Sequence, residues 1–559
     1  MKKINLICGI LLFSLLTGLT GCGQVVTKTA SIRDNKSVTY YQTEASVDLC
    51  ESSSYEDYEY PVYSNSTQSA KADMYAEEEC YPFPGFDPFN TEEYSLNKEN
   101  SFCSVVSNPL STFAADVDTA SYSNFRRFVT EGFGINDFPA GVVRTEEMIN
   151  YFTYNYDEPK NNEIFNVDSV ISDCPWNKDN KLLSIGINTK SMDTREIPAS
   201  NIVLLIDVSG SMQDTNKLPL IKEAMSLLIE QFTKKDRISI VTYASGVQTI
   251  LNGASGNSQR EINKAFEKLI AYGSTNGGDG IKMAYDVAEE NFIKGGVNRV
   301  IICSDGDFNV GLTSQAELYD LISEKKENGI FLSVLGFGMY NYSDTNMETL
   351  ADNGNGNYAY IDTLSEAKKV LIDEMTSTFV TVAKDVKLQV EFNPATVYEY
   401  RLVGYENRTM AAKDFTDDSK DGGELGAGHQ VTVLYEIVPY NGEENGSGLK
   451  YQNNNLSDKG RAFDEYCTLS IAYKDIDKDT SKYLEYPINT KNYTNNPDDD
   501  FTFASMVAMT SLALQNSAYI EDFSREEALD EVISTIRKMD LNDEYKEEFY
   551  DLCRDLKRH

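Results

Sequence analysis

Histidine is nearly absent from this sequence, which holds only His429 and His559 among 559 residues. Zinc sites built from histidine and Ser-His-Asp catalytic triads are therefore strongly disfavoured. Positive charge is also scarce, because 50 Lys and Arg residues face 88 Asp and Glu residues, for a formal net charge of -38. Nucleic-acid binding depends on cations that meet phosphates, so a DNA- or RNA-binding role is disfavoured as well. The chemistry left open uses carboxylates, hydroxyls and a hard metal ion.

The nine cysteines show no CxxC spacing, which argues against a cysteine-bound metal cluster. Cys8 lies in the apolar N-terminal segment, and Cys22 follows that segment. The other seven are an odd number, so at least one is free or bonded to another molecule. A disulfide between two of them stays open, and its pairing is not readable. The seven are Cys50, Cys80, Cys103, Cys174, Cys303, Cys467 and Cys553.

The N-terminus has the pattern of a secretory signal peptide. Lys2 and Lys3 precede residues 4–19, which are almost wholly apolar or small and too few for a comfortable membrane span. The segment ends in Leu19-Thr20-Gly21-Cys22, which resembles the bacterial lipobox. The resemblance implies removal of residues 1–21, a lipid anchor at Cys22 and a location on the extracytoplasmic face of the cell membrane. We favour a Gram-positive cell surface, with a periplasmic or outer-membrane location as the alternative.

Composition and periodicity change several times along the chain. Residues 22–104 are polar and acidic with few aliphatic residues, so little hydrophobic core can form there. Beyond residue 380, apolar residues recur with a period of two, which is typical of antiparallel strands. The predicted parts are a lipoprotein signal peptide (1–21), a flexible tether (22–104), an N-terminal flanking α+β region (105–199), an α/β domain (200–378), an antiparallel β module (379–490) and a C-terminal helical region (491–559).

Apolar strands alternate with amphipathic helices between residues 200 and 378. Residues 202–206 form a continuous apolar run, as a buried parallel strand requires. Apolar residues recur at helical spacing within 217–232 and again within 277–292. The alternation predicts an α/β fold with a doubly wound, mainly parallel sheet, flanked by the antiparallel β module and the C-terminal helices.

Oxygen-bearing side chains follow the predicted strands of this domain. Asp207, Ser209 and Ser211 alternate along one loop, and ligands of open α/β sheets bind beyond the carboxyl ends of the strands. Thr275 precedes a predicted helix, and Asp305 follows another predicted strand. Mg²⁺ takes about six oxygen ligands and keeps several waters. The three loops therefore predict a divalent-cation site with an open coordination position.

Asp207-x-Ser209-x-Ser211, followed by Thr275 and Asp305-Gly306, resembles the metal-ion-dependent adhesion site of von Willebrand factor type A domains. The resemblance implies that Ser209 and Ser211 bind the metal directly, and that Thr275 does so in the liganded state. Asp207 and Asp305 would act mostly through waters. It implies Mg²⁺ as the cofactor, with Mn²⁺ possible, and a partner protein whose Asp or Glu completes the coordination. Segments 108–122, 144–151, 399–408 and 426–432 resemble the flanking regions of a bacterial lipoprotein family with a central type A domain.

These features lead to one expected function and two alternatives. We expect a membrane-anchored adhesion or assembly lipoprotein that captures an acidic side chain of a partner protein through Mg²⁺. The alternatives are a structural or maturation factor of the cell envelope and a metal-assisted hydrolase. The predicted site offers no histidine and no nucleophile paired with a base, so we expect the protein not to be an enzyme. The sequence does not indicate the oligomeric state.

Three other features receive a structural interpretation. Residues 116–120 are similar to a phosphotransferase motif, but Ala120 departs from it, and Thr119 is expected to cap a helix. His429 follows a glycine-rich stretch and is expected to have a hydrogen-bonded structural role. Trp176, the only tryptophan, is expected to lie in a core.

Overall fold

Contacts divide the chain into two units, Met1–Tyr75 and Ala76–His559, and every residue that the computed structural model describes lies in the second. The predicted signal peptide (1–21), Cys22, Thr275 and most of the predicted tether (22–104) lie outside the described residues. The described residues are 94, 98–115, 118–139, 141–161, 163–274, 277–306, 315–339, 344–442, 462–476, 478, 480–520 and 522–559.

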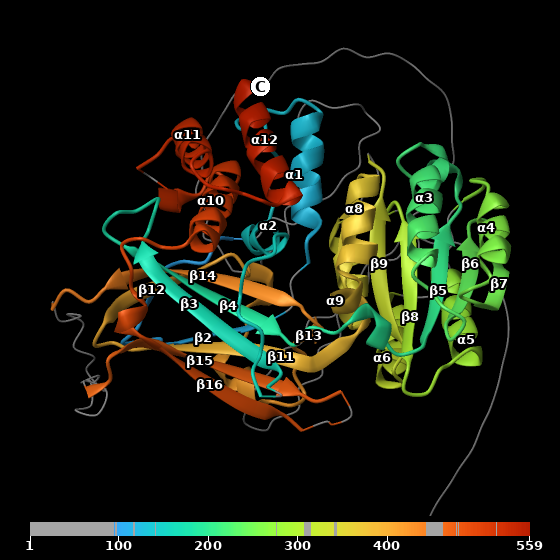
Figure 1. Cartoon of the computed structure of the whole chain (residues 1–559), viewed down its shortest axis with the longest axis horizontal. Helices are drawn as coiled ribbons and strands as arrows, with labels where there is room; N and C mark the ends of the chain where they lie inside the picture. Colours follow the sequence, from blue (N-terminus) through green and yellow to red (C-terminus); the bar gives the residue numbers. More distant parts are fainter. Residues whose placement is uncertain are drawn as a thin grey trace, which may run out of the picture. The chain divides into compact units, whose positions relative to one another are not determined.

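A six-stranded sheet forms the centre of the α/β domain (Figure 1). Its strands are β5 (Ser200–Asp207), β6 (Arg237–Tyr243), β7 (Val247–Ser255), β8 (Val297–Ser304), β9 (Phe331–Phe337) and β10 (Tyr358–Ile361). They lie in the order β10-β9-β8-β5-β6-β7, and all neighbours are parallel except the antiparallel pair β6 and β7. The predicted doubly wound, mainly parallel sheet is confirmed.

Helices cover both faces of this sheet because the central strands are apolar on both sides. In β5, Ile202 and Leu204 face one hydrophobic core, whereas Val203 and Leu205 face another. The first core includes α3 (Leu218–Ile229), α4 (Gln259–Glu267), α8 (Leu364–Lys368), the π-helical turn η3 (Lys369–Asp373) and α9 (Met375–Phe379). The second includes α5 (Gly277–Glu290), α6 (Gln315–Glu327) and α7 (Asp344–Asn353).

Two antiparallel sheets pack face to face outside the α/β domain. The first contains β1 (Cys103–Ser104), β12 (Val397–Val403), β14 (Gln430–Pro439), β4 (Lys181–Thr189) and β3 (Phe165–Asp173), in that order. The second contains β13 (Gly423–Gly426), β11 (Thr381–Phe392), β15 (Glu465–Lys474) and β16 (Lys482–Asn489), and β2 (Leu110–Ala114) also pairs with β11. Leu388 of β11 and Val433 of β14 are buried in the core that the two sheets share.

The two predicted flanking regions form these sheets together. β4, from the predicted region 105–199, pairs with β14 from the predicted module 379–490. Residues 98–104, which the sequence places in the tether, also belong to the folded part, because β1 pairs with β12 and Asn100 Nδ2 donates to the Gly404 carbonyl at 2.8 Å. The whole α/β domain separates these partners in sequence, so no local pattern reveals their pairing.

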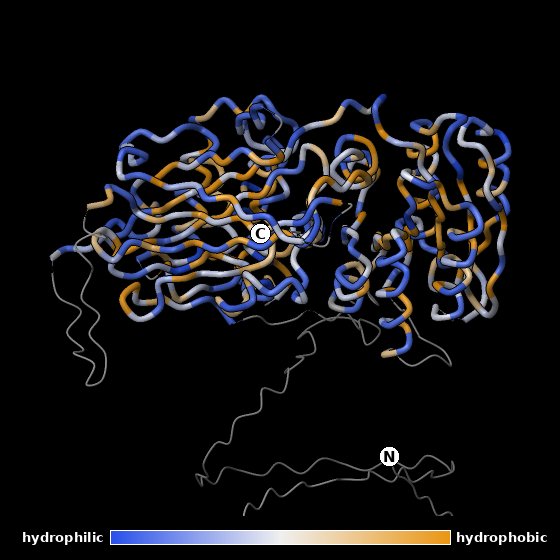
Figure 2. Tube along the Cα trace, turned by 90° about the horizontal axis from the view of Figure 1, so that it is seen from below, coloured by the Kyte–Doolittle hydropathy of each residue, from blue (hydrophilic) through white to orange (hydrophobic). Residues whose placement is uncertain are grey.

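A helical layer covers the other face of the first antiparallel sheet (Figure 1). It contains α1 (Ala120–Thr130), α2 (Thr145–Asn150), α10 (Asp499–Leu514), α11 (Arg525–Ile536) and α12 (Glu544–Arg558). Phe125 of α1 and Phe549 of α12 share its core with Leu434 of β14 and with Trp176, which is 1% exposed. In Figure 2, hydrophobic segments recur inside the strands and helices, and many outer turns are hydrophilic.

Two sequence expectations about helices have different outcomes. The predicted C-terminal helices are confirmed as α10, α11 and α12, and α10 is buried along almost its whole length. Thr119 occupies the N-cap position of α1, as expected, but its side chain makes no capping hydrogen bond. In the described part of the chain, no helix combines the length and apolar character needed to cross a membrane.

Buried arginines join the α/β domain to the flanking unit, which is the pair of antiparallel sheets together with the helical layer. Arg126 of α1 donates to Asp362, after β10, at 2.5 Å and to Glu366 of α8 at 2.7 Å. Arg144, which precedes α2, lies 2.6 Å from Asp344 of α7. Because these ion pairs are buried, removing either arginine would leave carboxylates without their cation.

Candidate metal site

The loop after β5 positions three of the predicted oxygen donors. Asp207 is the last residue of β5 and is fully buried, and its Oδ1 accepts a hydrogen bond from the Ser209 N–H at 2.7 Å. The Ser209 and Ser211 hydroxyl oxygens lie 3.0 Å apart. Ser209 is buried and Ser211 is exposed, so the two hydroxyls lie at the boundary between the interior and the solvent.

Two backbone hydrogen bonds hold the loop that precedes α5 against the Asp207–Ser211 loop. The Tyr272 N–H donates to the Val208 carbonyl at 2.7 Å, and the Gly210 N–H donates to the Gly273 carbonyl at 2.9 Å. Gly273 has a φ of +96°, and a Cβ there would lie 2.5 Å from a neighbouring serine hydroxyl, so the position requires glycine. Thr275 follows this fixed segment but lies outside the described residues.

β8 places Asp305 at the same edge of the sheet. β8 is the parallel neighbour of β5, and Asp305 directly follows its last residue. Asp305 is fully buried, and its Oδ2 accepts a hydrogen bond from Lys217 Nζ at 3.0 Å. The structure therefore gathers four of the five predicted site residues at one edge of the sheet: Asp207, Ser209, Ser211 and Asp305.

The charges at this edge of the sheet favour the binding of a cation. Burial raises the pKa of Asp207 to about 7; the hydrogen bond from the Ser209 N–H lowers it, and the nearby charge of Asp305 raises it. The Tyr243 hydroxyl lies close enough to lower this pKa, yet Asp207 Oδ2 is buried and has no partner with hydrogen-bond geometry in the described part of the chain. A divalent cation would offset both the carboxylate repulsion and the missing contact.

The donor set favours a hard cation. Within the described ranges, no group of three or more His, Cys, Asp and Glu side chains is placed to hold a metal ion. The candidate site instead combines two carboxylates with serine hydroxyls, which suit Mg²⁺ better than a metal that prefers thiolate or imidazole. The five described cysteines are all free thiols: Cys103, Cys174, Cys303, Cys467 and Cys553.

Sequence reasoning missed two features of this edge. Lys217 reaches Asp305 from the start of α3, and only its position shortly after the Asp207–Ser211 loop hints at this role. Ile270 and Tyr272, on the loop held against the Asp207–Ser211 loop, are 75% and 79% exposed. Exposed apolar side chains beside a charged site are typical of a surface that contacts another protein.

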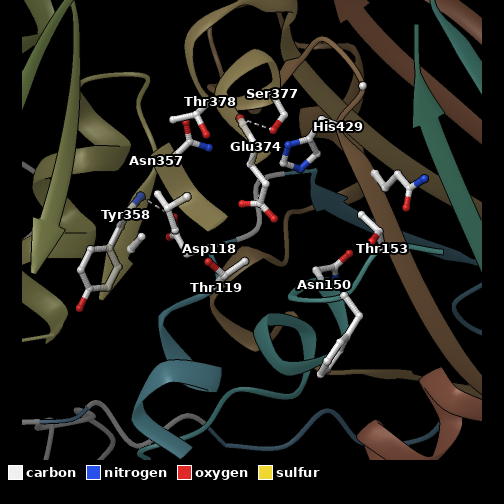
Figure 3. Close-up of a pocket in the computed structure, with 15 residues that line it drawn as sticks. Asp118, Thr119, Asn150, Thr153, Asn357, Tyr358, Glu374, Ser377, Thr378 and His429 are labelled. Atoms are coloured by element: carbon white, nitrogen blue, oxygen red, sulfur yellow. Dashed lines mark hydrogen bonds between the residues drawn. The ribbon is translucent and has the colours of Figure 1, made fainter. Parts of the chain in front are cut away.

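A polar cavity of about 90 Å³ lies elsewhere, beside the first residues of β10 and therefore at the opposite edge of the sheet from Asp305. Figure 3 shows Asp118, Glu374 and His429 around it. Asp118 accepts a hydrogen bond from the Tyr358 N–H at 2.8 Å. Burial lowers the pKa of His429, which keeps its imidazole neutral at pH 7. This cavity is separate from the candidate metal site.

Three family models match consecutive parts of the chain. A von Willebrand factor model matches residues 88–184, the von Willebrand factor type A domain model matches residues 201–374, and the model for the C-terminal part of the uncharacterized protein YfbK matches residues 377–558. YfbK of Escherichia coli (strain K12), described as uncharacterized, is 40% identical over 441 residues, which cover 78% of this chain and 76% of that protein.

The chain belongs to the YfbK family. Its α/β domain is a von Willebrand factor type A domain. Most of the second antiparallel sheet and the helices α10, α11 and α12 lie within the part that matches the YfbK C-terminal model. The resemblance to a family with a central type A domain is confirmed at this level.

Two solved structures are similar in fold. A von Willebrand factor type A protein from Catenulispora acidiphila is 14% identical, covers 79% of this chain and 88% of its own, and gives a TM-score of 0.39. Proximal thread matrix protein 1 from the mussel byssus is 20% identical, covers 34% of this chain and 46% of its own, and gives a TM-score of 0.28. That structure has zinc in its metal-ion-dependent adhesion site. Both likenesses concern the fold alone.

Proposed function

We propose that this YfbK-family chain is a protein-binding lipoprotein whose type A domain captures an acidic side chain of a partner through Mg²⁺. One observation carries the proposal. Two buried carboxylates, Asp207 and Asp305, lie at the same sheet edge as the Ser209 and Ser211 hydroxyls, and Asp207 Oδ2 accepts no hydrogen bond of good geometry from the described part of the chain, although the Tyr243 hydroxyl is near. A divalent cation is the ligand whose charge and oxygen preference match this set.

Each residue has a distinct proposed role. The Ser209 and Ser211 hydroxyls would bind the cation directly, and Thr275 would do so when a partner is bound. Asp207 and Asp305 would hold the cation mostly through waters, while Asp207 also fixes the loop by accepting from the Ser209 N–H. When bound, the cation supplies positive charge to the partner's Asp or Glu. Mg²⁺ is the first candidate, and Mn²⁺ has the same preference for oxygen.

The charge and the surface of the chain favour a macromolecular partner. At a formal net charge of -38, the chain repels acidic molecules over most of its surface, so an acidic group needs a local cation to bind. The exposed Ile270 and Tyr272 side chains beside the loop offer apolar contacts that a small free anion would not use. An acidic residue flanked by apolar residues on a partner protein fits both features.

The anchor and the location belong to the same proposal. A lipid at Cys22 would hold the chain at the extracytoplasmic face of the cell membrane, with a Gram-positive surface favoured over a periplasmic or outer-membrane site. A factor that binds its partner only during envelope maturation would use the same cation site. The site's described residues include no histidine and no nucleophile paired with a base, which favours binding over catalysis.

Crosslinking in intact cells tests the proposal. Wild-type chain, Ser209→Ala and the control Ser226→Ala would each be crosslinked with and without EDTA. The hydroxyl of Ser226 bonds within α3, to the Lys222 carbonyl at 2.7 Å. We expect one crosslinked species that disappears with EDTA and in Ser209→Ala but persists in the control. Crosslinks that survive EDTA would contradict cation-dependent capture, and crosslinks confined to growing envelope would favour the maturation role.

A further inference from the structure

A buried lysine lies at the candidate metal site although it is not one of the oxygen donors. Lys217 directly precedes α3 and is 3% exposed. Its Nζ donates to Asp305 Oδ2 at 3.0 Å, and Asp305 is fully buried. Burying an ammonium group is costly unless it is paired, and ordering the long lysine side chain costs entropy as well. The position therefore indicates a specific pairing with the site's carboxylate.

The fold provides a path for this side chain. Gly338, which directly follows β9, has a φ of +85°, and a Cβ on it would lie 2.2 Å from Lys217 Cε. The Tyr360 hydroxyl donates to the Gly338 carbonyl at 2.7 Å and fixes this backbone. Only glycine leaves room for the lysine stem here, so β9 and β10 both help to direct the ammonium group to Asp305.

The formal charges of the three described side chains Asp207, Asp305 and Lys217 have a simple balance. Ionised Asp207 and Asp305 and the Lys217 ammonium together leave one negative charge before a cation binds. A divalent cation turns this into one net positive charge, which an incoming carboxylate neutralises. Without the lysine, the loaded site would be neutral and would attract a carboxylate less.

We propose that Lys217 is a positioning residue of the cation site. Its ammonium group shares Asp305 with the bound cation, which weakens cation binding and keeps the loaded site positive for the partner's carboxylate. This inference rests on the proposed function, since it assigns a role to Lys217 at the same site. It predicts opposite effects on two affinities when the charge is removed.

Lys217→Met removes the charge and keeps an apolar stem. Mn²⁺ should bind the variant at least about tenfold more tightly, because like charges a few ångströms apart interact strongly even at a high effective dielectric constant. Acetate, as a carboxylate probe, should bind the Mn²⁺-loaded variant about tenfold more weakly than the loaded wild type. A purely structural role would weaken both affinities, because a distorted site binds neither ligand well.

The experiment uses the full chain and two titrations. Mn²⁺ binding is measured by calorimetry, and acetate binding to the Mn²⁺-loaded protein is followed by electron paramagnetic resonance. Lys325→Met is the matched control, because it removes another buried lysine whose Nζ lies 2.6 Å from Glu289, outside the site. Circular dichroism checks folding, and Lys217→Gln replaces Lys217→Met if the latter does not fold.

The outcomes separate the two proposals. Tighter Mn²⁺ binding with weaker acetate binding, absent from Lys325→Met, supports the role of Lys217. Unchanged affinities, or a loss of both, overturn that role while the wild-type site stands. A wild-type chain that is folded and binds neither Mn²⁺ nor Mg²⁺ overturns the proposed function and this inference together.

Discussion

Arg126 offers a direct test of how the type A domain is held to the flanking unit. Its guanidinium lies 2.5 Å from Asp362, 2.7 Å from Glu366 and 2.9 Å from Glu548. The side chains of Arg126, Asp362 and Glu366 are at most 8% exposed, whereas that of Glu548 is 37% exposed and adds little. Breaking a buried ion pair from one side costs about 3–5 kcal/mol. We expect Arg126→Met to lower the free energy of unfolding by that amount at pH 8.

The loss should depend on pH with a defined sign. Burial raises the pKa of Glu366, and Arg126 opposes this shift. Without the arginine, the pKa of Glu366 rises further above its unfolded value, so the carboxyl group takes up a proton as the pH falls. The ionised, unpaired group destabilises the fold only above its unfolded pKa. The destabilisation by Arg126→Met should therefore be smaller at pH 5.5 than at pH 8.

Urea denaturation with two probes measures both effects. Fluorescence of Trp176, the only tryptophan, reports on the flanking unit, and far-ultraviolet circular dichroism reports on the whole chain. The two transitions should coincide in the wild type and separate in Arg126→Met. Arg195→Met, which removes an exposed pair with Asp193, should change nothing measurable. A loss below about 1 kcal/mol at pH 8, the range of exposed pairs, would show that the Arg126 ion pairs do not hold the type A domain in place.

Three further predictions follow from other parts of the structure. Glu436→Ala should cost about 3–5 kcal/mol in urea denaturation, because Glu436 is buried and accepts from Arg401 at 2.8 Å and from the Trp176 indole at 3.0 Å; a loss typical of a surface substitution would contradict this. Burial, with the charges of Glu406 and Glu147 adding to it, raises the pKa of Glu146 to about 8. Glu146 takes up a proton on folding, so the free energy of unfolding should fall as the pH rises from about 4.5 to about 8, by at most about 1.4 kcal/mol per pH unit. In denaturation curves measured across this range, Glu146→Gln should flatten the slope. Tyr272→Ala should weaken crosslinking to the partner several-fold and leave Mn²⁺ binding unchanged in calorimetry, whereas an equal loss of both would place Tyr272 in the cation site itself.

Local patterns were enough to predict the centre of the fold. The apolar run at residues 202–206 reflects a strand covered on both faces, and β5 lies there. Such a run cannot reveal β7, because the residues of this edge strand are only partly buried and lack the pattern. The sequence places the antiparallel strands in separate regions, because their pairing, as between β4 and β14, joins segments on either side of the type A domain.

The candidate site is likewise predictable from the sequence only in part. Asp207, Ser209 and Ser211 lie on one short loop, so their alternation is visible in the sequence, and the order of parallel strands brings Asp305 to the same edge. Lys217 could not be predicted, because its role depends on a path over Gly338, which belongs to a distant strand end. Likewise, no local pattern shows that the exposed Tyr272 lies beside Val208, whose carbonyl accepts a hydrogen bond from the Tyr272 N–H.

Calorimetric titration of the folded chain with Mn²⁺ and Mg²⁺ shows whether a divalent cation binds at the Asp207–Ser211 loop. We expect one divalent-cation site per chain, which disappears in Ser209→Ala and persists in Ser226→Ala, with circular dichroism unchanged in both variants. Absence of uptake by the folded wild type, or uptake that Ser209→Ala leaves intact, would contradict it.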